Sequence, residues 1–400
     1  MVPQVDTGRE AAGAGLKYLS RIGALALAAG IAAAPIHLQA SPQVPAAEDA
    51  PIAMLVDATT GQVLHARDAD RRFLPASVTK VMTAYVAFEM LSDGRLSPDK
   101  IFTVSDEVYE KWSGTGSSMF LQRGEKVSVD KLLQGITTVS ANDGCVALAE
   151  GAAGSLENWI VLMNRAAHDL GMNDSHFGSP NGFPDEGQTF TSAQDLAKLA
   201  HALTTRHAAL YERYFGKHRF AHNGYEQVNH DPITGVVPGA DGIKTGFTRE
   251  AGYNFLGSAK RDGRRLAMVV AGVDNGARRA RISRDYLEWG FSAFEARELF
   301  APEEIVAHAA VQDGAERSVA LRSAFPILAN IKEGTNPAIA LTLHYRGPIK
   351  APIAAGTEVA ELEVRIDGFA PYRIPLQAAA DVPEANFWQR MVNGVASFLS

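Results

Sequence analysis

The apolar positions along the chain predict strands near its beginning and again after residue 250, with helices between them. Short apolar runs at 53–56 and 63–66 flank a polar turn, and runs at 253–259 and 266–272 are joined by the turn 260–263. Such paired runs are typical of β-hairpins. Because hairpins supply the strands, we expect an antiparallel sheet built from N-terminal and C-terminal pieces.

Helical spacing dominates the stretch between the two strand pairs. An amphipathic run with apolar residues at 78, 81, 82, 85, 86 and 90 follows Pro75, and residues 100–235 show further helical patterns broken by Gly and Pro. A last long helix is predicted over about 281–298. The region 50–300 is therefore predicted to be an α/β (α+β) domain with an antiparallel sheet and a helical subdomain.

The patterning changes after about residue 301. Apolar and polar residues alternate over 339–345 and 360–366, which predicts strands with one solvated face. We expect a small all-β domain over 301–382. Beyond it, residues 387–399 return to helical spacing with apolar side chains on one face. The segment 384–400 is predicted to be an amphipathic helix that either anchors the protein at a membrane surface or packs onto the β-domain.

The N-terminus has the pattern of a secretory signal peptide. Arg9, Lys17 and Arg21 precede an apolar run over 22–35, and small residues follow up to a cleavage point after Ala40. The run is shorter than the ~20 residues that a membrane-spanning helix needs. A buried Ala-rich helix is the alternative. We exclude residues 1–40 from the fold and expect an exported protein on the periplasmic side of the cytoplasmic membrane.

The composition excludes several classes of protein and of binding site but does not change the predicted fold. A net charge of −7 argues against a protein that binds nucleic acid by neutralising phosphates. The single cysteine, Cys145, allows no intrachain disulfide and is interpreted as a buried thiol. No Gly-rich nucleotide loop occurs, and the pair His218 and His222 lacks a third metal ligand. We therefore predict neither a metal nor a cofactor.

The segment 77–80 has the form S-x-x-K and carries the first candidate chemistry. At a helix start this spacing puts Ser77 and Lys80 one turn apart on the same face. A serine hydroxyl needs an adjacent base, and a lysine can be that base if burial lowers its pKa. The same form occurs at Ser97 and Ser128, where each serine is interpreted as an ordinary helix N-cap.

Two further motifs favour Ser77 as a nucleophile over Ser77 as a cap. Ser140-Ala141-Asn142 has the form S-x-N, and Lys244-Thr245-Gly246 is K-T-G before the strand pattern at 253. The three motifs stand in that order at separations of 63 and 104 residues. Serine β-lactamases and penicillin-binding proteins combine these motifs.

The chain resembles the low-molecular-mass penicillin-binding proteins of the D-alanyl-D-alanine carboxypeptidase family, peptidase family S11. The residues around the motifs match as well: 74–76 before the first, 143–145 after the second, and 241–243 and 251–253 around the third. The resemblance spans about residues 50–300 and implies the fold shared by serine β-lactamases and DD-peptidases. It also implies an enzyme that removes the terminal D-Ala from peptidoglycan stem peptides and is acylated by β-lactam antibiotics as covalent inhibitors.

The resemblance assigns a role to each motif residue. Ser77 attacks the penultimate D-Ala carbonyl, Lys80 takes its proton, and Ser140 relays a proton to the leaving amine. Asn142 holds the substrate backbone and Lys80. The third motif, 244–246, forms the substrate-binding strand. In it Lys244 supplies positive charge, Thr245 donates a hydrogen bond to the terminal carboxylate, and Gly246 is also counted among the substrate-binding residues.

The resemblance assigns two further roles outside the three motifs. The oxyanion hole is expected at the backbone N–H groups of Ser77 and Phe247, the latter at a position where relatives often have histidine. An arginine that helps hold the carboxylate is assigned to Arg279, with Arg281 as the alternative.

Two other functions remain open. A serine β-lactamase would share the acylation chemistry, but residues 165–190 lack the E-x-x-x-N pattern of class A deacylation. A non-catalytic envelope protein that binds peptidoglycan would not need the intact set of Ser77, Lys80, Ser140 and Lys244. Both alternatives are therefore less favoured than a carboxypeptidase.

Overall fold

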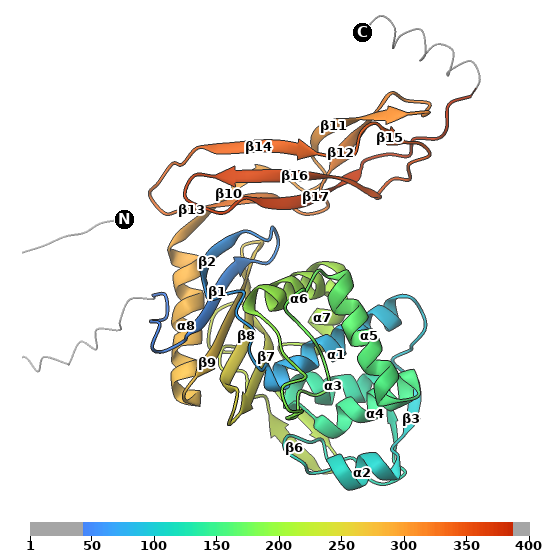
Figure 1. Ribbon diagram of the computed structural model, residues 1–400, viewed down its shortest axis with the longest axis vertical. Coiled ribbons are helices and arrows are strands. Elements are labelled where there is room, and N and C mark those ends of the chain that lie inside the picture. Colours follow the sequence, from blue (N-terminus) through green and yellow to red (C-terminus); the bar gives the residue numbers. More distant parts are fainter. Residues whose placement is uncertain (1–42, 387–400) are drawn as a thin grey trace, which may run out of the picture. The chain divides into compact units, whose positions relative to one another are not determined.

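The computed structural model describes residues 43–386. Its first part contains a five-stranded antiparallel sheet in the order β2-β1-β9-β8-β7 (Figure 1). The strands are β1 (Ile52–Asp57), β2 (Val63–Arg67), β7 (Ala240–Thr248), β8 (Gly252–Arg261) and β9 (Arg264–Val273). Pairing β1 with β9 joins the N-terminal and C-terminal pieces, which confirms the predicted antiparallel sheet.

Apolar residues on both faces of this sheet are buried, which explains why the strands have continuous apolar runs. One face packs on helix α8 (Gly276–Ser292), with Leu55, Phe255 and Tyr286 in a shared core. The other face packs on the helical part of the domain, where Met54 and Val269 share a core with α1. The helices of that part are α1 (Lys80–Ser92), α2 (Asp106–Trp112), α3 (Val129–Val139), α4 (Asn142–Ala153), α5 (Leu156–Asp169), α6 (Ala193–Arg206) and α7 (Ala208–Tyr214).

Three local predictions in this domain were wrong. Helix α1 is buried on nearly all sides instead of being amphipathic, because sheet and helices surround it. Ser97 caps no helix: it begins a turn in which the Lys100 N–H donates to the Ser97 carbonyl at 3.1 Å. Two short antiparallel strand pairs were missed, β3 (Ile101–Thr103) with β4 (Lys126–Ser128) and β5 (Arg219–His222) with β6 (Tyr225–Val228). Ser128, by contrast, caps α3 as predicted, accepting from the Lys131 N–H at 3.2 Å.

The last long helix ends at Ser292, short of the predicted 298, because the chain turns into a strand as soon as Phe294 enters the core beside α8. That strand, β10 (Phe294–Phe300), pairs with β13 (Ile327–Lys332). A six-stranded sheet follows in the order β14-β16-β17-β12-β11-β15. Its strands are β11 (Ile305–Gln312), β12 (Ser318–Arg322), β14 (Ile339–His344), β15 (Ile349–Lys350), β16 (Glu358–Ile366) and β17 (Tyr372–Ala378).

A buried set of polar side chains connects the β-domain to the first domain, next to strands β1 and β2. The Gln62 side-chain amide exchanges two hydrogen bonds of 2.7 Å with the backbone of Asn330 on β13. The Asn330 amide donates to Asp57 Oδ2 at 2.9 Å. The Gln62 side-chain amide therefore pairs with β13 in the way that the backbone of a neighbouring strand would.

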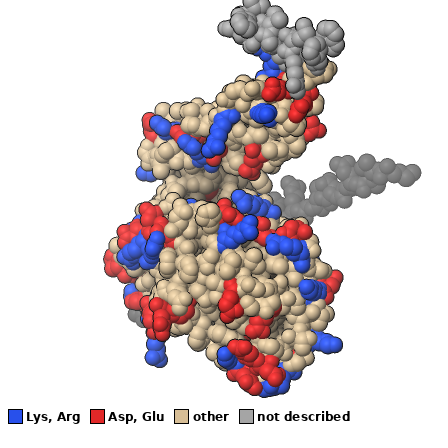
Figure 2. All heavy atoms as spheres, turned by 45° about the vertical axis from the view of Figure 1, so that its right-hand side comes forward, with Lys and Arg blue, Asp and Glu red and all other residues tan. Residues whose placement is uncertain are grey.

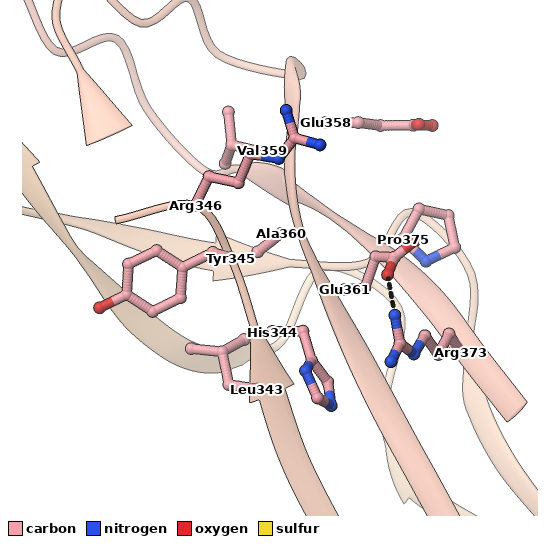
Figure 3. Close-up of a pocket in the computed structure, with 10 residues that line it drawn as sticks. All are labelled: Leu343, His344, Tyr345, Arg346, Glu358, Val359, Ala360, Glu361, Arg373 and Pro375. Atoms are coloured by element: carbon pink, nitrogen blue, oxygen red, sulfur yellow. Dashed lines mark hydrogen bonds and ion pairs between the residues drawn. The ribbon is translucent and has the colours of Figure 1, made fainter. Parts of the chain in front are cut away.

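On the face shown in Figure 2, acidic and basic side chains are interspersed, so no large area of this face carries charge of only one sign. The β-domain has a hollow of about 690 Å³ formed by β14, β16 and β17 (Figure 3). Arg373 in this hollow is paired with Glu361 at 3.1 Å, and none of the motif residues lines it. The candidate chemistry lies in the first domain.

Candidate active site

The nucleophile motif forms a tight turn that aligns its two functional side chains. Ser77 lies in the 3₁₀ turn η1 (Ala76–Thr79), and Lys80 begins α1 directly after it. Residues three apart eclipse each other in this geometry. Lys80 Nζ accordingly lies 2.8 Å from Ser77 Oγ. Ala76 has a φ of 50°, an uncommon conformation for a residue with a side chain, which is often found at functional sites.

Lys80 is placed where an ammonium group is costly. The side chain is 1% exposed, and burial lowers the pKa of Lys80 to about 8, with Cys145 and Asp143 partly opposing the shift. Its second hydrogen bond goes to the backbone carbonyl of Asn181 at 2.7 Å. A lysine with a lowered pKa that touches a serine hydroxyl can act as a general base.

The loop that supplies Asn181 fits against the nucleophile turn so closely that one residue must be glycine. Gly182 has a φ of 69°, and a Cβ added there would lie 1.9 Å from the Ala76 carbonyl oxygen. Sequence reasoning missed Asn181, because a backbone carbonyl carries no residue-type signal. The Asn-Gly dipeptide, a strong turn former, was the available clue.

The second motif connects α3 and α4 and turns Ser140 into a left-handed conformation with a φ of 64°. Ser140 Oγ is buried and has no hydrogen-bond partner within residues 43–386. Such an unsatisfied hydroxyl is costly in a core and is explained by a site that a substrate completes. Asn142 donates from Nδ2 to the Thr115 carbonyl at 2.9 Å. The structure gives it no hydrogen bond to Lys80, so that part of its expected role was wrong: Asn181 holds Lys80 instead.

Asp143 organises the segment that faces the second motif. Its buried carboxylate accepts from Ser118 Oγ at 2.7 Å, from the N–H groups of Met119 and Leu121 at 3.0 Å each, and from the Gly144 N–H at 2.9 Å. Sequence reasoning matched Asp143 as part of the motif's surroundings but assigned it no role. Neighbouring Cys145 is fully buried, as predicted, and burial raises the pKa of its thiol to about 12.

The third motif lies on β7, the edge strand of the sheet, against the nucleophile turn. A Cβ at Gly246 would lie 2.3 Å from the Pro75 carbonyl oxygen, so only glycine allows this approach. Lys244 is 5% exposed, and burial together with the neighbouring Lys80 ammonium lowers the pKa of Lys244 to about 7. Two lysines thus share a buried site in which repulsion favours the neutral form of one of them.

The arginines at the start of α8 point to different partners. Arg278 pairs with Asp274 at 2.7 Å, and Arg281 pairs with Asp49 at 3.5 Å. Arg279 forms no ion pair among the described residues; it lies 5.7 Å from the Tyr253 ring, and its Nε is buried without a partner. Burial lowers the pKa of Arg279, and its charge acts on that of Lys244. Arg279, not Arg281, therefore offers an unused cation on the motif side.

Phe247, directly after the third motif, is 49% exposed and stacks on Tyr253 with ring centroids 4.1 Å apart. Its side chain therefore extends away from the buried lysines and brings no titratable group. Its backbone lies on β7 one residue past Gly246, which itself contacts the nucleophile turn.

Comparisons with known proteins agree with this geometry. The family model for D-alanyl-D-alanine carboxypeptidase, peptidase S11, matches residues 38–275. The chain belongs to the peptidase S11 family. A second family model, for the C-terminal domain of penicillin-binding protein 5, matches residues 294–384.

Relatives of this S11 protein match over most of their length. It is 32% identical to D-alanyl-D-alanine carboxypeptidase DacF of Bacillus subtilis over 85% of its own chain and 88% of the relative. It is also 32% identical to DacA of Escherichia coli K12 over 86% of both chains. Among solved structures, penicillin-binding protein 5 of Haemophilus influenzae matches with a TM-score of 0.70 at 29% identity, covering 86% of this chain and 100% of that one.

Proposed function

We propose that this S11 protein is an exported serine D-alanyl-D-alanine carboxypeptidase that removes the terminal D-Ala from peptidoglycan pentapeptide stems. The contact between Ser77 Oγ and the buried Lys80 Nζ at 2.8 Å carries the proposal, because it pairs a nucleophile with its base. The structure of penicillin-binding protein 5 of Haemophilus influenzae matches 86% of this chain, which supports β-lactams as covalent inhibitors of the same serine.

The proposed reaction has two steps. Ser77 Oγ attacks the penultimate D-Ala carbonyl carbon while neutral Lys80 takes the hydroxyl proton. The bond to the terminal D-Ala nitrogen then breaks, and Ser140 passes a proton to that leaving amine. Water hydrolyses the Ser77 ester in the second step and returns the free serine. The Ser77 and Phe247 N–H groups stabilise the oxyanion in both steps.

The structure favours a carboxypeptidase over a β-lactamase at the loop that faces Ser77. Rapid deacylation of the class A kind uses a glutamate in this loop. Here the loop presents the Asn181 carbonyl to Lys80, and the Asp185 carboxylate is occupied by the Thr189 N–H at 3.1 Å. The one glutamate of this loop, Glu186, is exposed, and its side chain makes no hydrogen bond to Ser77 or Lys80. Fluorescent penicillin labelling and D-Ala release from a D-Ala-D-Ala peptide, measured together, test the function. Rapid turnover of penicillin without D-Ala release would instead identify a β-lactamase.

Replacing Thr245 by valine is expected to weaken the preference for a free terminal carboxylate by about tenfold or more. Thr245 lies between Lys244 and Gly246 on β7, and valine removes its hydroxyl at nearly constant volume. A hydrogen bond to a charged group contributes about 1.5–3 kcal/mol. The measurement compares kcat/KM for peptides ending in D-Ala and in D-Ala amide. An unchanged ratio of the two constants would remove Thr245 from carboxylate recognition.

The location of the protein rests on its two ends, which lie outside the described residues except for 384–386. Within residues 43–386 no helix is long and apolar enough to cross a membrane. We place the enzyme on the periplasmic face of the cytoplasmic membrane, exported by the signal peptide 1–40 and attached by the amphipathic helix of 384–400. Apolar burial would dominate this attachment, because Arg390 is the only basic residue in that helix.

Full-length mature protein is expected to float with liposomes at both low and high salt, whereas protein truncated after Asn386 stays soluble and active. The truncation must spare residues 383–385, because the Ala315 N–H donates to Pro383 and the Ala385 N–H to Asp313, each at 2.8 Å. An earlier end would therefore disturb the β-domain itself. Equal distribution of the two proteins in the flotation gradient would argue against an anchor.

A further inference from the structure

Two aromatic rings, those of Phe120 and Tyr225, stack on each other at the surface of the first domain. Their centroids are 4.4 Å apart, and the rings are tilted by 38°. Tyr225 is 53% exposed, and neither side chain belongs to a hydrophobic core of residues 43–386. Core packing therefore does not explain this ring pair, and none of the roles assigned above uses it.

Hydrogen bonds on both sides hold the ring pair in place. Phe120 has a φ of 61°, an uncommon conformation for a residue with a side chain. Its carbonyl accepts from Asn223 Nδ2 at 3.0 Å. Gln227, which lies on the same face of β6 as Tyr225, donates from Nε2 to the Ser118 carbonyl at 3.0 Å. Rings fixed in this way can bind a ligand without first losing conformational freedom.

The ring pair is built on the segment that faces the second catalytic motif. The Ser117 carbonyl accepts from the Asn142 N–H at 2.8 Å, and Ser118 Oγ donates to Asp143 Oδ2 at 2.7 Å. The Phe120 N–H in turn donates to Ser118 Oγ at 2.9 Å. A stem peptide branches from a glycan strand, and its five residues extend over about 17 Å or less. The glycan strand of a bound substrate therefore has to pass close to this segment.

The charged side chains of the hairpin that carries Tyr225 are already paired. His222 Nε2 lies 2.7 Å from Glu125 Oε1. Arg219 pairs with Glu226 at 2.7 Å on the opposite face of the hairpin. These pairs leave no free charge on the hairpin residues 219–228. The ring pair therefore favours an uncharged ligand over a nucleic acid or an anionic lipid surface.

The size of the exposed surface favours a sugar over a protein partner. A whole aromatic side chain buries roughly 150–250 Å², and both of these rings are already partly covered. They offer less than the ~800 Å² that each partner of a stable protein complex buries. A single ring face matches the flat apolar face of a pyranose. The exposed amides of Gln122 and Asn223, which both donate to the Phe120 carbonyl, keep their oxygens available for sugar hydroxyl and N-acetyl groups.

We propose that Phe120 and Tyr225 form a binding platform for the glycan strand of peptidoglycan, the neutral chain of N-acetylated sugars from which the stem peptides branch. The proposal rests on the carboxypeptidase function and adds the polymer to the substrate that this function recognises. Tyr225 stacks on a sugar ring, and Phe120 supports the tyrosine ring from its other side. Both residues act on binding of the polymer and take no part in bond breaking at Ser77.

The test compares D-Ala release from a free pentapeptide with release from the same pentapeptide carried on soluble glycan chains of several disaccharide units. The wild-type enzyme is expected to prefer the glycan-bound stem about three- to tenfold in kcat/KM, the range of one aromatic stacking contact. Tyr225→Ala should bring the ratio of the two constants to about one. Tyr225→Phe keeps the ring and should keep the wild-type ratio.

Tyr345→Ala is the matched control, because Tyr345 is a tyrosine of the β-domain that is 38% exposed and lies outside the platform. It should also keep the wild-type ratio. Equal constants for the two substrates in the wild-type enzyme, or a ratio that Tyr225→Ala leaves unchanged, would overturn the proposal.

Absence of D-Ala release from both substrates would instead contradict the carboxypeptidase function. Binding of fluorescent glycan chains to the Ser77→Ala protein tests the platform without any reaction. Adding Tyr225→Ala to that protein should weaken this binding by the same three- to tenfold. Equal affinity of the single and the double variant for the glycan chains would refute the platform whatever the enzyme hydrolyses.

Discussion

Replacing Ser77 by alanine is expected to abolish covalent labelling by fluorescent penicillin and the release of D-Ala. The change removes the only atom that can form the acyl-enzyme and breaks the 2.8 Å contact with Lys80 Nζ. The backbone turn around it should survive, because Pro75 and the Val78 N–H maintain it through a 3.2 Å hydrogen bond. Gel fluorescence after incubation with the labelled penicillin measures the effect.

The chain provides two matched controls in the other serines of S-x-x-K form. Ser128→Ala removes the N-cap of α3, which costs about 1 kcal/mol of stability, but it should leave labelling intact. Ser97→Ala changes an exposed turn and should affect neither property. Labelling of the Ser77→Ala protein at the wild-type rate, or its loss in either control, would refute the assignment of the nucleophile.

Replacing Lys80 by arginine is expected to lower the acylation rate by about 10²–10⁴-fold, the usual contribution of general acid–base catalysis. Burial lowers the pKa of Lys80 to about 8, so roughly a tenth of the lysine is neutral at pH 7 and about half at pH 8. Arginine keeps its proton throughout this range and cannot accept another from Ser77. Stopped-flow or quenched measurements of penicillin acylation give the rate directly.

The pH dependence of the same reaction separates a base from a merely structural lysine. Since the reactive form is the deprotonated one, the wild-type acylation rate should rise with pH, reach half of its limiting value near pH 8 and level off about one pH unit higher. The residual rate of Lys80→Arg should lack this rise, and circular dichroism should show that the variant is folded. A variant that retains more than a tenth of the rate, a barrier change below ~1.4 kcal/mol, would exclude Lys80 as the base.

The sequence was sufficient for the parts of the site that depend on residue type. A serine, a lysine and a K-T-G strand at fixed order identify the chemistry because few other side chains can perform it. The same reasoning could not find the Asn181 carbonyl, since every residue has one and only the fold aims it at Lys80. Nor could it choose between Arg279 and Arg281, because that choice depends on which guanidinium Asp49 neutralises.

In the fold, too, features set by the local sequence were predictable, whereas features set by tertiary packing were not. The hairpins at 52–67 and 252–273 were predictable because short apolar runs and the turns between them are local properties. Helix α1 was correctly predicted to be a helix, but its burial on nearly all sides was not predicted. A helix enclosed on all sides has few polar positions, so its sequence does not show which face is buried. The end of α8 was misplaced because Phe294 is drawn into a core that distant strands create.

The pairing of Gln62 with Asn330 has a consequence for how such proteins can be recombined. Exchanging the β-domain between relatives would leave Gln62 its two backbone partners at position 330, but a new residue there would remove the side-chain amide that donates to the fully buried Asp57 carboxylate. A buried acceptor that loses its partner costs about 1–3 kcal/mol. A chimaera joined at residue 293 therefore has to carry the hairpin turn at 57–62 and the strand at 327–332 as a matched pair, although 265 residues separate the closest of them along the chain.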